Sequence, residues 1–149
     1  ENSTLESIGK DVFSSSSLQQ IRIPSKVKKI GNGAFFGCNK IHKFEFSDNS
    51  ELCYIGKATF HRSSIKNITI QNKIKEIDNK AFEYCNDLKC IEILGDDLVI
   101  KKFCFNYCKT CGMISFPNAM KISIYINALY CTSPDLILYT CPNIEINKL

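Results

Sequence analysis

Nine cysteines and two histidines are the residues of this chain that could support metal or thiol chemistry. Cys108 and Cys111 form a C-x-x-C pair, which is typical of structural zinc sites and of redox-active disulfides. A structural zinc site needs four ligands, commonly a second such pair or two histidines. The only later cysteines, Cys131 and Cys141, are separated by nine residues, and both histidines lie far upstream. We therefore expect no metal site and no cofactor.

The sequence does not favour a catalytic site either. A nucleophilic cysteine would need His42 or His61 beside it, together with a third group to orient the imidazole. No G-x-S-x-G, H-E-x-x-H or phosphate-binding loop motif is present. We expect a protein that is not an enzyme.

An internal repeat explains where the cysteines stand. Residues 2–48 align with residues 49–95 without a gap, and about 20 of the 47 positions are identical. Each such unit contains two copies of a shorter pattern, I-x-x-x-A-F followed by Cys three residues later, at intervals of 22 to 25 residues. The anchor isoleucines are Ile8, Ile30, Ile55, Ile77, Ile100 and Ile124. The aromatic positions are Phe13, Phe35, Phe60, Phe82 and Phe105, with Leu129 in the last copy.

Five cysteines occupy inward positions of this repeat: Cys38, Cys85 and Cys108 after the phenylalanine, Cys104 in the alanine position and Cys111 in the leucine position. Free cysteine behaves as a small, often buried hydrophobic residue. We therefore expect structural thiols that pack one repeat on the next. Equivalent positions in stacked coils lie roughly 5 Å apart, so a disulfide between neighbours stays open, although Ser63 interrupts the series.

A second signal in each repeat is an apolar–any–apolar triplet preceded by a leucine-like residue, L-x-x-I-x-I. The triplets span residues 21–23, 44–46, 68–70, 91–93, 114–116 and 136–138. One such strand every twenty-odd residues is the leucine-rich repeat pattern. The sequence predicts a leucine-rich repeat solenoid, α/β or mainly β, of about six short coils. We expect a parallel β-sheet on one face, with short strands and helical turns on the other.

Glycine recurs directly after the anchor isoleucine at Gly9, Gly31 and Gly56, and Asp78 takes this position in the fourth copy. Glycine adopts positive φ without steric cost, and Asp tolerates it. We therefore predict a tight turn with positive φ at this position in each coil.

Length and charge limit the remaining possibilities. We predict one domain over residues 1–149, part of a longer array because the chain begins inside a repeat, with 119–149 as a degenerate last coil and C-terminal edge. No apolar run is long enough to span a membrane, and no signal-peptide core is visible. The net charge is only +4, and the lysine clusters lack interleaved aromatics, so we expect no nucleic-acid partner.

The run IPSKVKKIGNGAFFGCNKIHKFEF, residues 23–46, resembles the BspA-like (Treponema-type) leucine-rich repeats, and residues 70–93 repeat it without the proline and glycine. The resemblance covers about residues 2–118. It implies a solenoid that binds a protein or another macromolecule. Many such proteins resemble surface antigens or adhesins, which implies a cell-surface or extracellular location. Others are intracellular scaffolds, so a cytoplasmic location is the alternative.

The strand pattern also predicts which side chains such a partner would meet. In L-x-x-I-x-I the residues between and beside the isoleucines point away from the core, and stacking aligns them in columns. The candidate binding residues on this face are Gln20, Arg22, Lys43, Glu45, Asn67, Thr69, Glu92, Met113, Ser115 and Ile137, with Ile137 placed in the column of Arg22 and Ser115. The early half is polar and the later half is more apolar. The apolar part also fits the exposed end of a stack of coils, and self-association through that edge stays open.

Overall fold

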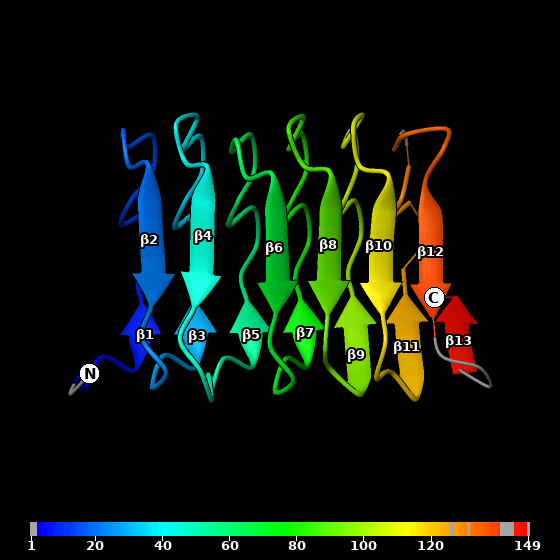
Figure 1. Cartoon of the computed structure of the whole chain (residues 1–149), viewed down its shortest axis with the longest axis horizontal. Helices are drawn as coiled ribbons and strands as arrows, with labels where there is room; N and C mark the ends of the chain where they lie inside the picture. Colours follow the sequence, from blue (N-terminus) through cyan, green and yellow to red (C-terminus); the bar gives the residue numbers. More distant parts are fainter. Residues whose placement is uncertain (1–2, 126, 131, 141–144, 149) are drawn as a thin grey trace.

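The structure is a computed structural model that describes residues 3–125, 127–130, 132–140 and, for the backbone, 145–148. Successive coils stack side by side, and each contributes a strand to each of two layers (Figure 1). One layer is a seven-stranded parallel sheet in the order β1-β3-β5-β7-β9-β11-β13. Its strands are β1 (Ser7–Ile8), β3 (Lys29–Ile30), β5 (Tyr54–Ile55), β7 (Glu76–Ile77), β9 (Asp97–Ile100), β11 (Lys121–Ile124) and β13 (Glu145–Lys148).

The second layer contains the predicted L-x-x-I-x-I strands and is split in two. β2 and β4 form a two-stranded sheet, and β6, β8, β10 and β12 form a four-stranded sheet. The bounds are β2 (Gln20–Ile23), β4 (Lys43–Phe46), β6 (Asn67–Ile70), β8 (Cys90–Ile93), β10 (Met113–Phe116) and β12 (Ile137–Thr140). The predicted solenoid of parallel strands is confirmed, including the short strands of the other layer.

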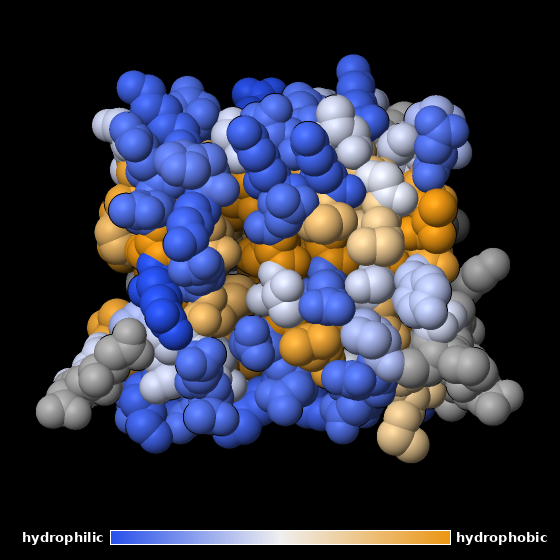
Figure 2. Space-filling model, in the orientation of Figure 1, coloured by the Kyte–Doolittle hydropathy of each residue, from blue (hydrophilic) through white to orange (hydrophobic). Residues whose placement is uncertain are grey.

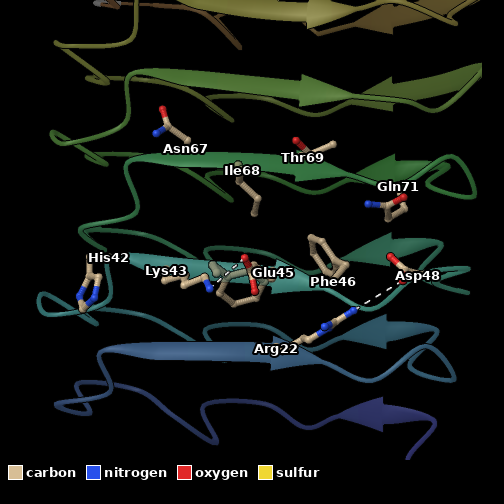
Figure 3. A pocket seen from close by; sticks show the side chains of 11 residues that line it. Arg22, His42, Lys43, Glu45, Phe46, Asp48, Asn67, Ile68, Thr69 and Gln71 are labelled. Carbon is tan, nitrogen blue, oxygen red and sulfur yellow. Dashed lines mark ion pairs between the residues drawn. The ribbon is translucent and has the colours of Figure 1, made fainter. Parts of the chain in front are cut away.

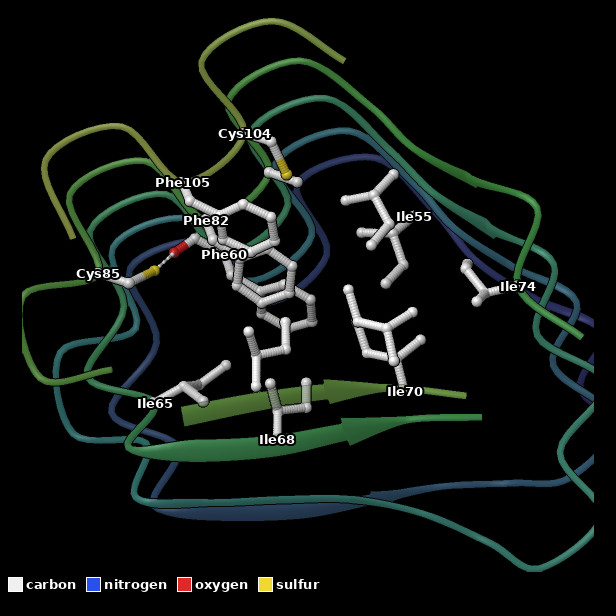
Figure 4. Close-up of a cluster of buried hydrophobic side chains, with 14 of the residues drawn as sticks. Ile55, Phe60, Ile65, Ile68, Ile70, Ile74, Phe82, Cys85, Cys104 and Phe105 are labelled. Atoms are coloured by element: carbon white, nitrogen blue, oxygen red, sulfur yellow. Dashed lines mark hydrogen bonds between the residues drawn. The ribbon is translucent and has the colours of Figure 1, made fainter. Parts of the chain in front are cut away.

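The core lies between the two layers and repeats from coil to coil. Alternation places every second side chain of β4, β6 and β8 inward, and these side chains are buried. The phenylalanines form a continuous stack with ring centroids 5.0–5.5 Å apart, from Phe13 through Phe105. Figure 4 shows Phe60, Phe82 and Phe105 stacked above the inward isoleucines. Stacking thus buries an apolar face that a single coil could not bury.

The predicted helical turns are wrong. The described residues contain no helix, and the segments after the anchor isoleucines are tight turns. In these turns the backbone has positive φ at two positions four residues apart in each of the first five coils. These residues are Asp11 and Ser15, Gly33 and Gly37, Ala58 and Arg62, Lys80 and Tyr84, and Phe103 and Tyr107. A residue with positive φ interrupts an α-helix, so no i→i−4 hydrogen bonds can continue.

The backbone hydrogen bonds of these turns run mainly between coils. The N–H of Phe35 donates to the carbonyl of Thr59 at 2.8 Å, and the N–H of Phe60 donates to the carbonyl of Ala81 at 2.7 Å. The intervening N–H groups close turns onto the residue three positions back, as Ala34 does with Gly31 at 3.2 Å. These turns therefore form a third ladder of hydrogen bonds between coils, in addition to the two sheets.

The predicted positive φ of the glycines after the anchor isoleucines is also wrong. Among glycines, positive φ occurs at Gly33 and Gly37. A Cβ atom on Gly31 would lie 2.8 Å from the carbonyl carbon of Gly9, and one on Gly56 would lie 2.7 Å from Oδ1 of Asn32. Glycine is thus required at Gly31 and Gly56 because adjacent coils approach closely there.

The last strand is shifted by two residues from its predicted register. Ile137 pairs with Met113, and Tyr139 pairs with Ser115. Ile137 therefore extends the column of Met113, and Tyr139 takes the place predicted for Ile137. Because a shift by two residues moves no side chain to the other face, alternation allows the triplet at 136–138 or at 138–140, and only the pairing with β10 distinguishes them.

Candidate functional site

The outer face of the split sheet carries the predicted binding residues. Eight of the ten candidates are exposed: Gln20, Arg22, Lys43, Glu45, Asn67, Thr69, Met113 and Ile137. Glu92 is half-buried, and Ser115 is only 6% exposed. Register aligns Arg22 with Glu45, Thr69 with Glu92, and Glu92 with Ser115, so these residues form neighbouring positions on one face. The structure brings the set together, apart from the break between β4 and β6.

A hollow of about 500 Å³ opens on this face where the sheet is split. Its walls come from β2 and β4 on one side and from β6 on the other, as Figure 3 shows. The lining residues are Arg22, His42, Lys43, Phe44, Glu45, Phe46, Asp48, Asn67, Ile68, Thr69 and Gln71. Five of the ten predicted residues therefore line one recess.

Charges on the β2–β4 wall are paired with each other. Arg22 Nη2 lies 3.8 Å from Asp48 Oδ2, and Lys43 Nζ lies 3.3 Å from Glu45 Oε1. These side chains are about half exposed or more, so each pair contributes little to stability. The β6 wall instead offers the neutral polar groups of Asn67, Thr69 and Gln71.

Sequence reasoning missed His42 and Asp48 as parts of this recess. Both lie just outside the β4 strand, where the L-x-x-I-x-I pattern gives no direction for a side chain. The length of the connection after β4 is a signal for Asp48. The last inward residue of β4, Phe46, lies nine positions before the next anchor isoleucine, whereas the corresponding separation before Ile30, Ile77 and Ile100 is seven. The longer connection carries Asp48 out beside Arg22.

The face becomes more apolar toward β12. Met113 is 40% exposed, and Ile137 and Tyr139 are 63% and 62% exposed. Figure 2 shows hydrophilic side chains over the β2–β4 side of this face and hydrophobic ones at the β12 end. A polar region and an apolar region thus adjoin along one extended surface.

The cysteines in the repeat positions are core residues. Cys38, Cys85 and Cys108 donate to the carbonyls of Phe13, Phe60 and Phe82, respectively, at 2.9–3.0 Å. Burial raises the pKa of Cys85 to about 12 and that of Cys111 to about 11, so both remain protonated at neutral pH. A protonated, buried thiol is neither a good nucleophile nor a metal ligand.

The seven described cysteines, Cys38, Cys53, Cys85, Cys90, Cys104, Cys108 and Cys111, are free thiols. Cys131 and Cys141 lie outside the described residues. Within the described part of the chain, no three or more His, Cys, Asp or Glu side chains are grouped so that they could hold a metal ion. The described residues also include no helix with the length and hydropathy that a membrane span requires.

The two histidines have different surroundings. His42 is exposed beside the hollow. His61 stacks on Phe36 with ring centroids 4.9 Å apart, and its Nδ1 lies 3.3 Å from the buried carboxylate of Glu83. Burial lowers the pKa of His61, although the nearby Glu83 carboxylate opposes this effect. Asn106 and Lys80 also contact the Glu83 carboxylate, so this cluster is a structural polar network.

Comparison with known proteins agrees with this geometry. The profile of the BspA type leucine rich repeat region matches residues 6–133 in six copies. No protein with a curated description matches this chain.

Two solved structures share the fold. A leucine rich cell surface protein from Faecalibacterium prausnitzii A2-165 superposes with a TM-score of 0.73 and 24% identity, over 97% of this chain and 43% of its own. The pneumococcal vaccine antigen PcpA superposes with a TM-score of 0.57 and 17% identity, over 98% of this chain and 36% of its own. The chain thus spans less than half the length of either protein.

Proposed function

Because this chain belongs to the BspA-type leucine-rich repeat family, we propose that it is a non-enzymatic module that binds a macromolecular partner through the outer face of the split sheet. The partner we propose is a protein. The observation that carries the proposal is the composition of this face, where exposed charged and amide side chains on β2, β4 and β6 adjoin exposed Met113, Ile137 and Tyr139. A polar rim beside apolar area is typical of protein-binding surfaces.

We also propose a cell-surface or extracellular location, as an adhesin or surface antigen. The description of the F. prausnitzii protein as a cell surface protein, and of PcpA as a vaccine antigen, supports this location. An intracellular scaffold is the alternative, and the seven free thiols favour it, because exported proteins more often pair their cysteines.

A paired capture experiment tests the face and the location together. The purified chain is presented to extracellular-matrix and foreign cell-surface proteins in one arm and to lysate of its own cells in the other. Each arm is repeated with the triple charge reversal Arg22→Glu, Glu45→Lys and Glu92→Lys. The matched control is Lys29→Glu, an exposed residue of β3 in the other sheet.

An adhesin that uses this face captures a partner in the first arm, loses it in the triple variant and keeps it in Lys29→Glu. Capture in the second arm alone, lost in the same variant, supports the scaffold. Capture that survives the triple variant contradicts the proposed face.

A further inference from the structure

We propose that the hollow between β4 and β6 is a binding site for neutral carbohydrate. This assignment is independent of the protein partner proposed above, because it concerns one recess and a different class of ligand. It rests on the break in the sheet, on the open backbone groups at the break and on the chemistry of the side chains around it.

The break has a local cause in the sequence of β4. Its inward residues are Phe44 and Phe46, whereas β2, β6 and β8 carry isoleucine at both inward positions. The ring of Phe44 packs at nearly a right angle against both Phe35 and Phe60, with ring centroids 5.0 and 4.9 Å away. The bulkier side chains and the longer connection after β4 both oppose the usual strand spacing of about 4.8 Å.

The coil that contains β4 and the coil that contains β6 remain joined by hydrogen bonds outside this face. The opening is therefore confined to one face. β5 pairs with both β3 and β7, and the N–H of Ser64 donates to the carbonyl of Cys38 at 3.2 Å. No backbone hydrogen bond joins β4 to β6, all of whose residues are described. The hollow therefore lies between two coils that are hydrogen-bonded to each other on their other sides.

The break leaves peptide groups without partners along both walls. The N–H group of Lys43 donates to the carbonyl of Gln19, just before β2, and that of Ser47 donates to the carbonyl of Ile23. By alternation the peptide groups of Phe44 and Phe46 therefore point toward β6. The same alternation directs the peptide groups of Asn67, Thr69 and Gln71 toward β4. A ligand that both donates and accepts hydrogen bonds can satisfy these groups.

A strand from a partner protein does not fit this arrangement. Strand addition needs an outward-facing edge with space for a neighbour at about 4.8 Å. Here β4 and β6 face each other side by side, and their Cα atoms approach within 8 Å, whereas an inserted strand would need roughly twice the normal strand spacing. The free backbone groups are therefore accessible from the outer face only.

The charges of the hollow favour a neutral ligand. Arg22 is paired with Asp48, and Lys43 is paired with Glu45, so two positive and two negative side chains cancel. A charged ligand would have to separate one of these pairs. A hydroxyl group instead donates to a carboxylate and accepts from a guanidinium, ammonium or amide group without disturbing the charge balance.

The floor of the hollow is apolar but almost closed to a ligand. Phe44, Phe46 and Ile68 line it and are only 4–7% exposed. The accessible surface of the hollow is therefore mainly that of its polar walls, which matches the rim of hydroxyl groups of a pyranose. The volume of about 500 Å³ lies in the range of small-ligand sites, roughly 300–1,000 Å³.

The test uses free oligosaccharides, so that its result does not depend on any protein partner. The purified chain is screened on an array of neutral, sialylated and sulfated glycans, and the best neutral glycan is titrated by saturation-transfer NMR. The test variant is Asn67→Ala with Gln71→Ala, which removes two neutral polar groups of the β6 wall. The control is Gln19→Ala, an exposed amide just before β2 and outside the hollow.

We expect binding to neutral glycans, at least tenfold weaker in the double variant and unchanged in Gln19→Ala. Circular dichroism and a thermal melt show whether the double variant is folded. Three results overturn the assignment: no neutral glycan binds, only sialylated or sulfated glycans bind, or the double variant binds as well as the original chain. None of them bears on protein capture by the face, which the charge-reversal experiment measures separately.

Discussion

Single residues in this chain act within columns, because each inward side chain contacts its equivalent in the coils before and after. Phe82 illustrates this, since its ring lies between Phe60 and Phe105 at centroid distances of 5.0 and 5.4 Å. It is fully buried. A cavity at this position therefore weakens two interfaces between coils as well as the packing within one coil.

Phe82→Ala is expected to lower the free energy of unfolding by about 3–5 kcal/mol, the usual range for a buried phenylalanine. Urea unfolding followed by circular dichroism measures the change. Lys66→Ala, at an exposed position, serves as the control and is expected to change stability by less than about 0.5 kcal/mol. If Phe82→Ala unfolds at the same urea concentration as the control, the aromatic stack does not hold the coils together.

The buried thiols predict that the protein loses stability at alkaline pH. Burial raises the pKa of Cys85 to about 12, whereas a cysteine in the unfolded chain has a pKa of about 8.5. Above pH 8.5 the folded state keeps a proton that the unfolded state loses, so the free energy of unfolding falls as pH rises. The stabilising contribution of the protonated thiol to the free energy of unfolding is complete below pH 8.5. It is lost progressively toward pH 12, at about 1.4 kcal/mol per pH unit per buried thiol.

Cys85→Ser isolates one thiol, and serine already occupies the equivalent position at Ser63. Urea unfolding under reducing conditions at several pH values from 7 to 10.5 gives the slope for each chain. The slope of the variant above pH 8.5 should be shallower by about 1.4 kcal/mol per pH unit. Equal slopes for the two chains would mean that Cys85 ionises as easily when folded as when unfolded.

At the scale of elements, strands were predictable from the sequence and turns were not. The triplet Ile68–Ile70 alternates in burial as its pattern indicates, because a sheet strand has a period of two. The turns depend on backbone conformation and not on the type of side chain, because residues as different as Lys80, Tyr84 and Ala58 all have positive φ there. Only the second coil marks both positions with glycine, at Gly33 and Gly37.

Positive φ at a residue with a side chain carries a cost that glycine would remove. Ala58 has φ of 54°, and Ala58→Gly is expected to raise the free energy of unfolding by about 0.5–1 kcal/mol. That figure is the strain relieved, about 1–2 kcal/mol, reduced by the greater freedom of glycine in the unfolded chain. The measurement is a thermal melt.

The reverse change, Gly37→Ala, serves as the matched comparison. It places a Cβ atom at φ of 65° and 3.3 Å from Ser15 Oγ, and it should destabilise the protein. A lower melting temperature for Ala58→Gly would show that the turn does not hold Ala58 in the left-handed region.

At the scale of the whole molecule, the repeat predicts a continuous stack of coils, and the break in one sheet departs from it. The candidate face was predictable because the columns follow from alternation, and Arg22 beside Glu45 is an example. The hollow was not, because every strand matches the same pattern and the pattern treats phenylalanine and isoleucine alike. Besides the longer connection after β4, its cause is the size of Phe44 and Phe46, which matters only once neighbouring coils are packed together.

The break makes a prediction about equivalent amides on successive coils. Ser47 and Leu94 each donate their N–H to the preceding coil, to the carbonyls of Ile23 and Ile70, both at 2.9 Å. Gln71 is the equivalent residue between them, but no carbonyl of β4 or its connection accepts its N–H. Native-state hydrogen exchange by NMR should therefore show protection at Gln71 lower than at Leu94, by on the order of tenfold.

Replacing Phe44 with isoleucine tests the cause of the break in the same experiment. The smaller side chain no longer packs edge-on against both Phe35 and Phe60, so β4 can approach β6 and the amide of Gln71 should become more protected. Leu94 is the internal control, because its hydrogen bond lies one coil away from the substitution. If Gln71 is already as protected as Leu94 in the original chain, the sheet is continuous in solution, and the hollow loses the open backbone groups that a carbohydrate would bind.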